Sequence, residues 1–538
     1  MYQDKRTKLY LPDSVRPKAS GYSEAAASLT RRALKGFTAR SGSPSEDIDW
    51  NNFTMRQRGR MLYMSSPLAT SAINTNRTKT VGIGLTLKPA VDREILGLTP
   101  EASKDWQRRT EAEFRLWASR KDACDATGMN NFDSLQQLAL VSWLMSGDVF
   151  PMITRRVPDR IRPYSLRIHL VEADRVRTPV DYGGGRYRGV TTGENPHNRN
   201  RIFDGVEVDS SGMVTAYYVH STYPWEITFA QNTWQRVKAY GEKNGLPNIL
   251  HVMSSERPDQ YRGVTYLAQV MEPLLQLRRY TDSALMMALV QSFFTAWIIT
   301  KSNPEMMPFN ETGDGVVGAP GTAGKDAPDA PRSEHEYSMG AGIVNVAPEG
   351  TDVKFGNPTM PVASFDTFVK TFCKLVGAGL GIPYDVLVKE YNSSYSAARA
   401  ALLDAWEEFR MRRKWFVDDF CQPVYEIWLS EAVARGRVIA PGFFSDPLIR
   451  AAWCSAQWIG PVQGSLDPLK EATAAVLKIQ HGLKTHEQAT MEDSGGDWNV
   501  NVEQLAAENE KLTAASGGAA VQVTVKPDDE EKEGENHV

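Results

Sequence analysis

The stretch that decides the fold covers residues 256–294 and reads ERPDQYRGVTYLAQVMEPLLQLRRYTDSALMMALVQSFF. A short polar run leads into a long and mostly apolar segment, which predicts a helix from Gly263 onward. Proline cannot donate to the helical hydrogen-bond ladder, so we expect an interruption or a kink at Pro273. Residues 283–300 carry no charge but include five polar side chains. A membrane span needs about 20 predominantly apolar residues, so this run favours a buried helix or a helix at an interface between subunits.

Two further helices are expected downstream of this stretch. Between Ser364 and Leu380, apolar side chains recur on one helical face for 17 residues, or about 25 Å. A longer helix is predicted from about Ser394 to Cys421, where no proline interrupts the chain. Its apolar stripe is typical of core packing, and we expect its charged face to be solvated or to contact another subunit. That face carries Arg399, Glu407, Glu408, Arg410, Arg412 and Arg413.

Upstream, the sequence alternates between helical and sheet patterns. Residues 99–117 read as a helix with Thr99 as its cap, and residues 131–146 read as a second helix. Between Val149 and Val252 the chain changes to short alternating runs separated by turn residues, and DSSG at 209–212 predicts a hairpin turn. These patterns predict an α+β fold, and 538 residues suggest about three to four structural units.

The composition of the chain is that of a globular protein, with 41% hydrophobic and 23% charged residues and a net charge of −4. Residues 1–40 carry nine Lys or Arg against three acids, whereas residues 526–538 carry six acids against two Lys. We expect both ends to be flexible arms. The four cysteines form no CxxC pair, and the N-terminus lacks the apolar stretch of a secretory signal.

No pattern in the sequence predicts catalysis, a metal site or a cofactor. APGTAGKD, at residues 319–326, places Gly324 and Lys325 as a phosphate-binding loop would, but lacks its first Gly and its final Ser or Thr. His481 and His486 are five residues apart, a spacing that matches no compact helical metal site. The sequence therefore argues against an enzyme. A nucleotide hydrolase that uses Lys325, and a membrane-associated or pore-forming assembly that uses residues 283–300, remain as alternatives.

Several stretches together resemble the portal proteins of lambda-type tailed bacteriophages. Within residues 256–294 the run Arg-Pro-x-Gln-x-Arg-Gly is present as Arg257, Pro258, Gln260, Arg262 and Gly263. Residues 379–413 resemble the family's Tyr-Ser-Ser-x-Arg region and the amphipathic helix after it, here with Tyr395, Ser396, Ala397 and Arg399, so that one serine is replaced by Ala397. With weaker matches elsewhere, the resemblance covers about residues 46–512.

The resemblance implies a ring, usually a dodecamer, at one vertex of the phage capsid in the virion. Double-stranded DNA would pass through the central channel during packaging and ejection. The ring would assemble in the host cytoplasm and have as partners the major capsid and scaffold proteins, the large terminase subunit and then the head–tail connector proteins. It would need no cofactor, no catalytic activity and no membrane.

The resemblance also divides the chain into parts of the portal fold. It implies a basic N-terminal arm at 1–45, a wing at 46–262, a stem helix at 263–296 and a clip at 297–360. A second stem helix would occupy 361–382, a tunnel-loop region 383–397, and a long helix with the wing's return 398–464. An α-helical crown at 465–512 and a disordered acidic tail at 513–538 would complete the chain.

The predicted tunnel loop supplies the candidate channel residues. Residues 385–396 contain two acids and one Lys, a charge of −1 per subunit, among neutral polar side chains. Because a strongly basic lining would bind the phosphates of the DNA it must pass, this composition favours sliding. The candidates are Lys389, Tyr391, Asn392, Ser393, Ser394, Tyr395 and Arg399.

Overall fold

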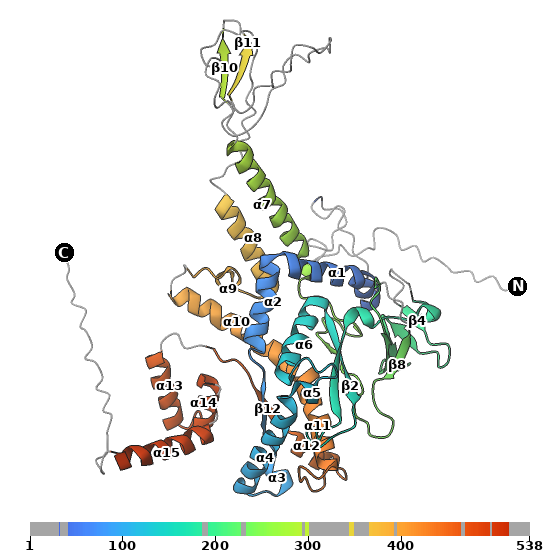
Figure 1. Cartoon of the computed structure of the whole chain (residues 1–538), viewed down its shortest axis with the longest axis vertical. Coiled ribbons are helices and arrows are strands. Elements are labelled where there is room, and N and C mark those ends of the chain that lie inside the picture. The colour runs from blue at the N-terminus through green and yellow to red at the C-terminus, as the bar shows by residue number, and fades with distance from the viewer. Residues whose placement is uncertain are drawn as a thin grey trace, which may run out of the picture.

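The computed structural model describes residues 41–184, 192–226, 233–292, 296–300, 344–348, 365–391, 395–463, 468–494 and 498–515, together with residues 32 and 496. Most of the predicted N-terminal arm, the Gly324–Lys325 run, residues 392–394 and the acidic tail lie outside these ranges. The described residues form an α+β body from which a pair of helices projects (Figure 1).

The centre of the body is a helical core built from distant parts of the chain. It contains α1 (Trp50–Ser65), α2 (Pro67–Thr80), α4 (Pro100–Ala118), α6 (Phe132–Ser146) and α11 (Gln422–Ala434). Phe114 of α4 contacts Trp428 of α11 edge to face, with 5.1 Å between the ring centroids. Smaller elements complete this part of the body: η4 (Ser45–Asp49), α3 (Arg93–Leu96), α5 (Lys121–Cys124), α12 (Pro447–Cys454), and the antiparallel strands β1 (Thr86–Pro89) and β12 (Ala456–Ile459).

Two antiparallel sheets lie beside this helical core, as the alternating pattern of residues 149–252 predicts. The first has the order β3-β2-β9, with β2 (Asp148–Arg155), β3 (Leu166–Glu172) and β9 (Val252–Met253). The second follows chain order through β4 (Thr192–Glu194), β5 (Arg201–Phe203), β6 (Val206–Val208), β7 (Val214–His220) and β8 (Trp234–Lys238). The predicted hairpin turn at 209–212 joins β6 to β7. Buried side chains of both sheets, among them Phe150 and Tyr217, form a separate apolar cluster.

The projecting pair consists of α7 (Met271–Ser292) and α8 (Phe365–Leu380), and beyond its far end β10 (Ala296–Thr300) pairs in parallel with β11 (Val344–Pro348) (Figure 1). Two sequence predictions are wrong here. The helix predicted from Gly263 begins only at Met271, and Pro273 neither interrupts nor kinks it, because Pro273 lies in the first turn of α7, where backbone N–H groups have no helical partner. Residues 283–300 do not form one helix, since the β-branched residues 298–300 pair with a strand distant in sequence.

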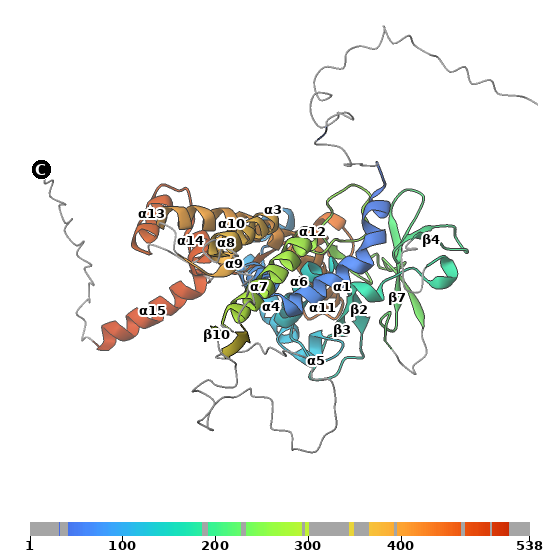
Figure 2. The ribbon, with the colours of Figure 1, turned by 90° about the horizontal axis from the view of Figure 1, so that it is seen from above.

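The remaining elements run from the base of this pair toward the C-terminus. After α9 (Tyr384–Val388), the predicted long helix is α10 (Tyr395–Phe416), which continues through a π-helical turn at Val417–Cys421 into α11. Helices α13 (Pro468–Gln480), α14 (His486–Ser494) and α15 (Trp498–Ala515) then lie on the side of the body opposite the five-stranded sheet (Figures 1 and 2). Helix α15 ends three residues beyond Leu512, where the predicted crown ends.

The charged face of α10 differs from the prediction. Arg412 is buried, and Arg413 donates hydrogen bonds to the backbone carbonyls of Lys79, Thr80 and Pro461 at 2.7–2.8 Å. These two arginines fasten α10 to α2 and to the chain after β12, so they are neither solvated nor free to contact another subunit. Within the described ranges, no helix combines the length and hydropathy that crossing a membrane requires.

Candidate functional site: a buried arginine cluster and the segment 383–399

The motif residues 257–263 form a tight turn that enters the space between the helical core and the sheets. The side-chain carbonyl of Gln260 accepts hydrogen bonds from the backbone N–H groups of Glu256 (2.8 Å) and Arg257 (3.1 Å). Its amide nitrogen donates to the carbonyl of Arg262 at 2.9 Å. Gln260 thus fixes the turn from within, whereas Arg257 is more exposed and pairs with Asp47 at the surface.

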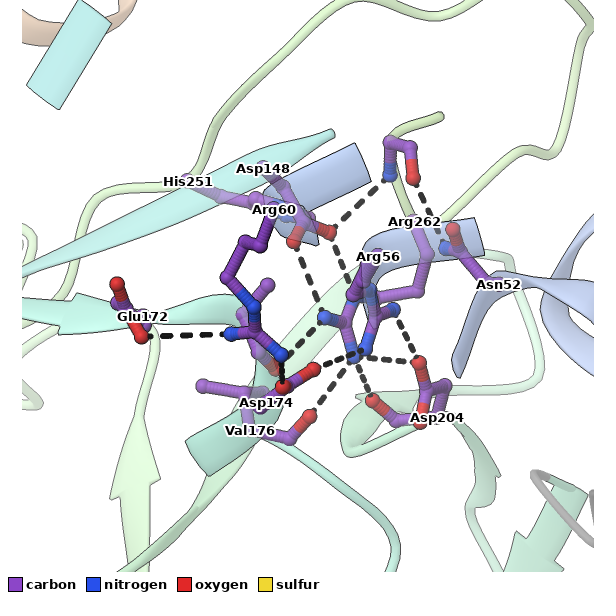
Figure 3. A network of polar contacts seen from close by, with 12 residues as sticks. Asn52, Arg56, Arg60, Asp148, Glu172, Asp174, Val176, Asp204, His251 and Arg262 are labelled. Carbon is purple, nitrogen blue, oxygen red and sulfur yellow. Dashed lines mark hydrogen bonds and ion pairs between the residues drawn. The ribbon is translucent and has the colours of Figure 1, made fainter. Parts of the chain in front are cut away.

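Arg262 is the centre of a buried cluster of charges, which Figure 3 shows. Its guanidinium makes two hydrogen bonds to the carboxylate of Asp148, from Nε at 2.6 Å and from Nη2 at 3.1 Å. Nη1 lies 2.8 Å from the carboxylate of Asp204, and further bonds reach the carbonyls of Val176 (2.9 Å) and Ala173 (3.0 Å). A side chain with no exposed surface is therefore fully hydrogen-bonded, as a buried charge requires.

Helix α1 is joined to the same cluster through three polar side chains (Figure 3). Arg56 donates to Asp204 at 2.6 Å, and Arg60 pairs with Asp174. Asn52 donates to the carbonyl of Gly263 at 2.9 Å. The cluster therefore holds together α1, the central strand β2 of the three-stranded sheet and the turn between β5 and β6.

The acids of the cluster differ in their protonation. Burial alone would raise the pKa of Asp148, but Arg262, a hydrogen bond from His251 and the charge of Arg56 hold it well below its usual range. Asp49 shows the opposite effect: burial, together with the nearby negative charge of Asp204, raises its pKa to about 7 against the influence of Arg262 and Arg56. The buried acids are thus not all ionised at neutral pH.

Gly263 has to be a glycine because two backbone segments meet there. A Cβ on Gly263 would lie 1.9 Å from the carbonyl oxygen of Gly147, well inside van der Waals contact. Gly147 follows α6 with a φ of 95°, and its own added Cβ would lie 2.5 Å from the carbonyl oxygen of Gly263. The last motif residue thus allows the chain to pass close beneath α6 before α7 begins.

The second candidate region is the predicted tunnel-loop segment, which begins at α9. Lys389 follows α9 with a left-handed φ of 62°, and Tyr391 is 69% exposed. Both residues line an open groove of about 570 Å³ whose other wall is the corner between α1 and α2. Between them, Glu390 accepts a hydrogen bond from the hydroxyl of Tyr384 at 2.6 Å and lies 3.8 Å from the ammonium of Lys370 on α8.

The structure brings only part of the predicted segment together. Lys389 and Tyr391 share the groove, whereas Arg399 lies on α10 with its guanidinium 3.6 Å from Glu471 of α13. Tyr395 is the first residue of α10. Asn392, Ser393 and Ser394 lie outside the described residues. The groove itself is positively charged, since its lining includes Lys79 and Lys389 and no acid.

Sequence reasoning missed the partners of the motif. Asp148, Asp204 and Arg56 are separated from Arg262 by 58 to more than 200 positions. Nothing in the local sequence of Asp204 or Arg56 distinguishes them from surface charges. The one usable signal was Asp148 itself, an acid at the start of an apolar strand. Among the described residues, no group of three or more His, Cys, Asp or Glu side chains could hold a metal ion, and the four cysteines are buried.

Comparison of the chain with models of known protein families gives a match. The family model described as "Phage portal protein, lambda family" matches residues 30–413. The chain belongs to the lambda family of phage portal proteins. The matched range includes the arginine cluster, the projecting pair α7 and α8, and most of α10. The resemblance that the motif at 257–263 indicated is confirmed.

Individual relatives agree with the family match. The portal protein of Escherichia phage N15 is 26% identical over 521 residues, which cover 93% of each chain. Portal protein B of Escherichia phage lambda is 25% identical over 488 residues, or 88% of this chain and 87% of that one.

Solved structures from gene transfer agent particles also align with the chain. The neck of the native particle, computed with C12 symmetry, covers 82% of this chain and 92% of its own, at 12% identity and a TM-score of 0.35. The virion of the native particle covers 75% and 93%, at 13% identity and a TM-score of 0.35.

Proposed function

We propose that the chain is one subunit of a portal ring at a single capsid vertex, with a central channel for double-stranded DNA during packaging and ejection. The observation that carries the proposal is the family match across residues 30–413, supported by portal-protein relatives aligned over about nine-tenths of their length. A dodecamer is the subunit number proposed. The ring would dock the large terminase subunit and later the head–tail connector proteins, and would contact capsid and scaffold proteins.

The parts of the molecule can be assigned roles on this proposal. Helices α7 and α8 form the stem, and β10 with β11 belongs to the clip beyond it (Figure 1). The two sheets and the helical core form the wing, and α13–α15 form the crown. The arginine cluster then has a mechanical role, because it ties the wing to the point where the chain enters the stem.

The segment after α9 would face the DNA, and its chemistry suits a surface that lets a polyanion pass. Glu390 is held at the base of the segment by Tyr384. In the adjoining groove, the hydroxyls of Ser71 and Thr78 donate their protons to backbone carbonyls of the chain itself, at 2.7 and 2.9 Å. These two hydroxyls are therefore not available to phosphate oxygens, and the cations that line the groove are Lys79 and Lys389. Weak contacts favour translocation, because each phosphate neutralised by Lys or Arg strengthens binding through counterion release.

The decisive experiment is the native mass of the purified protein, with negative-stain images of the same fraction. Twelve chains of 59.9 kDa predict a particle of about 719 kDa with a central hole. A compact dimer or tetramer without a channel would overturn the proposal. If the protein is purified as a monomer, the same measurement repeated after co-expression with scaffold protein decides the question, and a monomer there too would overturn it.

A further inference from the structure

Helices α13–α15 touch the rest of the chain through few contacts, and most of these are polar and exposed. Arg108 of α4 pairs with Glu503 of α15 at 2.7 Å, and Lys104 donates to Asn499 at 3.4 Å. In both views α15 extends away from the body (Figures 1 and 2). Within the chain α15 packs at its start, where Trp498 stacks on His486 of α14 with 5.4 Å between the ring centroids. The rest of this 18-residue helix is ordered with little packing to offset the thermodynamic cost.

The exposed surface of α15 carries the pattern of a helix that packs against another helix. Every side chain from Val500 to Thr513 is exposed. One face of α15, which we call the α15 seam, presents three apolar residues and one Asn at intervals of three and four: Val502, Leu505, Asn509 and Leu512. Leucine seven residues apart, with one Asn in the alternate position, is the arrangement of a helix–helix seam whose register is fixed by the polar residue.

Helix α13 presents a second strip of the same spacing. The α13 strip consists of Leu469, Thr473, Val476, Leu477 and Gln480, all exposed. Leu469 and Val476 are seven residues apart, and Leu469 has 76% of its surface in contact with solvent. The α15 seam and the α13 strip thus each expose several apolar side chains in a row. Single exposed leucines are normal on a protein surface, whereas rows of this kind are typical of interaction sites.

The charges beside the two strips are opposite in sign. Helix α13 carries Lys470 and Lys478 against a single acid, Glu471, which lies beside Arg399. Lys484, in the turn after α13, already pairs with Glu492 of α14 at 2.7 Å. Helix α15 carries Glu508 and Glu510 against Lys511, in addition to Glu503, which pairs with Arg108. Two different and complementary faces on one chain are what a head-to-tail contact between identical subunits requires, and such contacts close into rings.

We infer that the α15 seam of one copy packs along the α13 strip of the next copy. This contact rests on the proposed ring and adds to it a specific surface for subunit association. Its occupant is a second copy of this chain, because the chain itself supplies both an acidic apolar face and a basic apolar face of matching spacing.

The first test replaces the seam leucines in the full-length protein. Leu505→Asp with Leu512→Asp places charges in the proposed contact, whereas Ala507→Asp with Ala514→Asp places the same charges at the same spacing on the opposite face of α15. We expect the seam variant to lose at least tenfold of its assembled fraction by native mass, and the control variant to assemble as the wild type does. Since both sets of side chains are exposed, thermal unfolding of the body should be unchanged in either.

Assembly by the seam variant equal to that of the control would overturn the inference and leave the proposed ring intact. If the proposed function itself is wrong, the result is different: the wild-type chain forms no ring, even with scaffold protein.

A second test detects the contact directly and needs no complete ring. One chain carries Val476→Cys and a differently tagged chain carries Leu505→Cys, and the two are co-expressed and oxidised. The native cysteines are buried and need no replacement. We expect a reducible dimer that carries both tags, and at least fivefold less of it when Ala507→Cys replaces Leu505→Cys. Equal yields from the two pairs, or no mixed dimer, would contradict the inference.

Discussion

The arginine cluster and the segment after α9 are both rich in charged and polar residues, yet the chain treats them in opposite ways. In the cluster, Arg262 has no exposed surface and is bound by acids and carbonyls from three segments. In the segment, Lys389 and Tyr391 stand at an open groove. The contrast separates residues that hold the subunit together from residues left available to a passing ligand.

The strongest test of this contrast is Arg262→Met. The change leaves Asp148 buried without its main counter-charge, and we expect the free energy of unfolding to fall by about 3–5 kcal/mol. Arg257→Met is the matched control from the same motif, because its pair with Asp47 is exposed and contributes at most about 1 kcal/mol. Urea unfolding of both variants measures the difference. Equal losses would show that the motif is not divided into a buried and an exposed part.

The next effect is expected from Gly263→Ala. The new methyl group would overlap the carbonyl oxygen of Gly147, and separating the two segments should cost about 3 kcal/mol. Gly97→Ala is the control, since a Cβ there meets no atom within 4 Å and only its φ of 62° is unfavourable, at about 1 kcal/mol. Thermal unfolding of the two variants distinguishes them. A loss of stability no greater than that of the control would mean that the space between residue 263 and the end of α6 accommodates a methyl group.

The sequence predicted what local chemistry determines. The predicted cap Thr99 accepts a hydrogen bond from the N–H of Ala102 at 3.2 Å. The helix predicted at 131–146 is α6, and Asn131 caps it by accepting from the N–H of Ser134 at 2.9 Å. Thr485 and Gln488, also three positions apart, form a reciprocal capping box at the start of α14, with both bonds at 3.1 Å. These signals involve residues three positions apart, so one sequence suffices to find them.

What the sequence could not predict depends on contacts between distant segments. Arg412 and Arg413 look like the solvated face of a helix until α2 supplies the side chain of Asn76 and the carbonyls of Lys79 and Thr80. Residues 296–300 look helical until β11 pairs with them. The same holds for the partners of Arg262, which only the fold brings together.

A smaller effect is expected from pH, through Asp49 in the cluster. Its pKa is raised by burial and by Asp204 to about 7 in the folded chain, against 3.8 when unperturbed, so the folded state binds the extra proton between these values. The contribution of Asp49 to the free energy of unfolding is therefore fully present below about pH 4. It is lost as the pH rises toward 7, by up to about 1.4 kcal/mol per pH unit.

The test of this pH effect is Asp49→Asn, which mimics the protonated side chain. Between pH 4.5 and 6.5, the free energy of unfolding of the wild type should fall relative to that of the variant, and the difference should level off above about pH 7. A difference that stays constant with pH, measured by urea unfolding in matched buffers, would show that Asp49 is ionised throughout the range.

The smallest effect, on the amount of DNA packaged, is expected from removing the exposed charge of Lys389 at the groove. Lys389→Ala removes one cation per subunit from the groove, and we expect the amount of DNA packaged per head to stay within about twofold of the wild type, because translocation needs no tight phosphate contact.

The matched change in the opposite direction replaces Asn392, Ser393 and Ser394 with Lys. A ring lined with these added cations neutralises more phosphates and binds the duplex more strongly, by counterion release. We therefore expect packaging to stall early in this variant and to recover partly at higher salt, which weakens such contacts. If the lysine-rich ring packages normally at low salt, the segment does not contact the DNA during translocation, and the distinction between a bound interior and a sliding surface would have to be drawn elsewhere in the molecule.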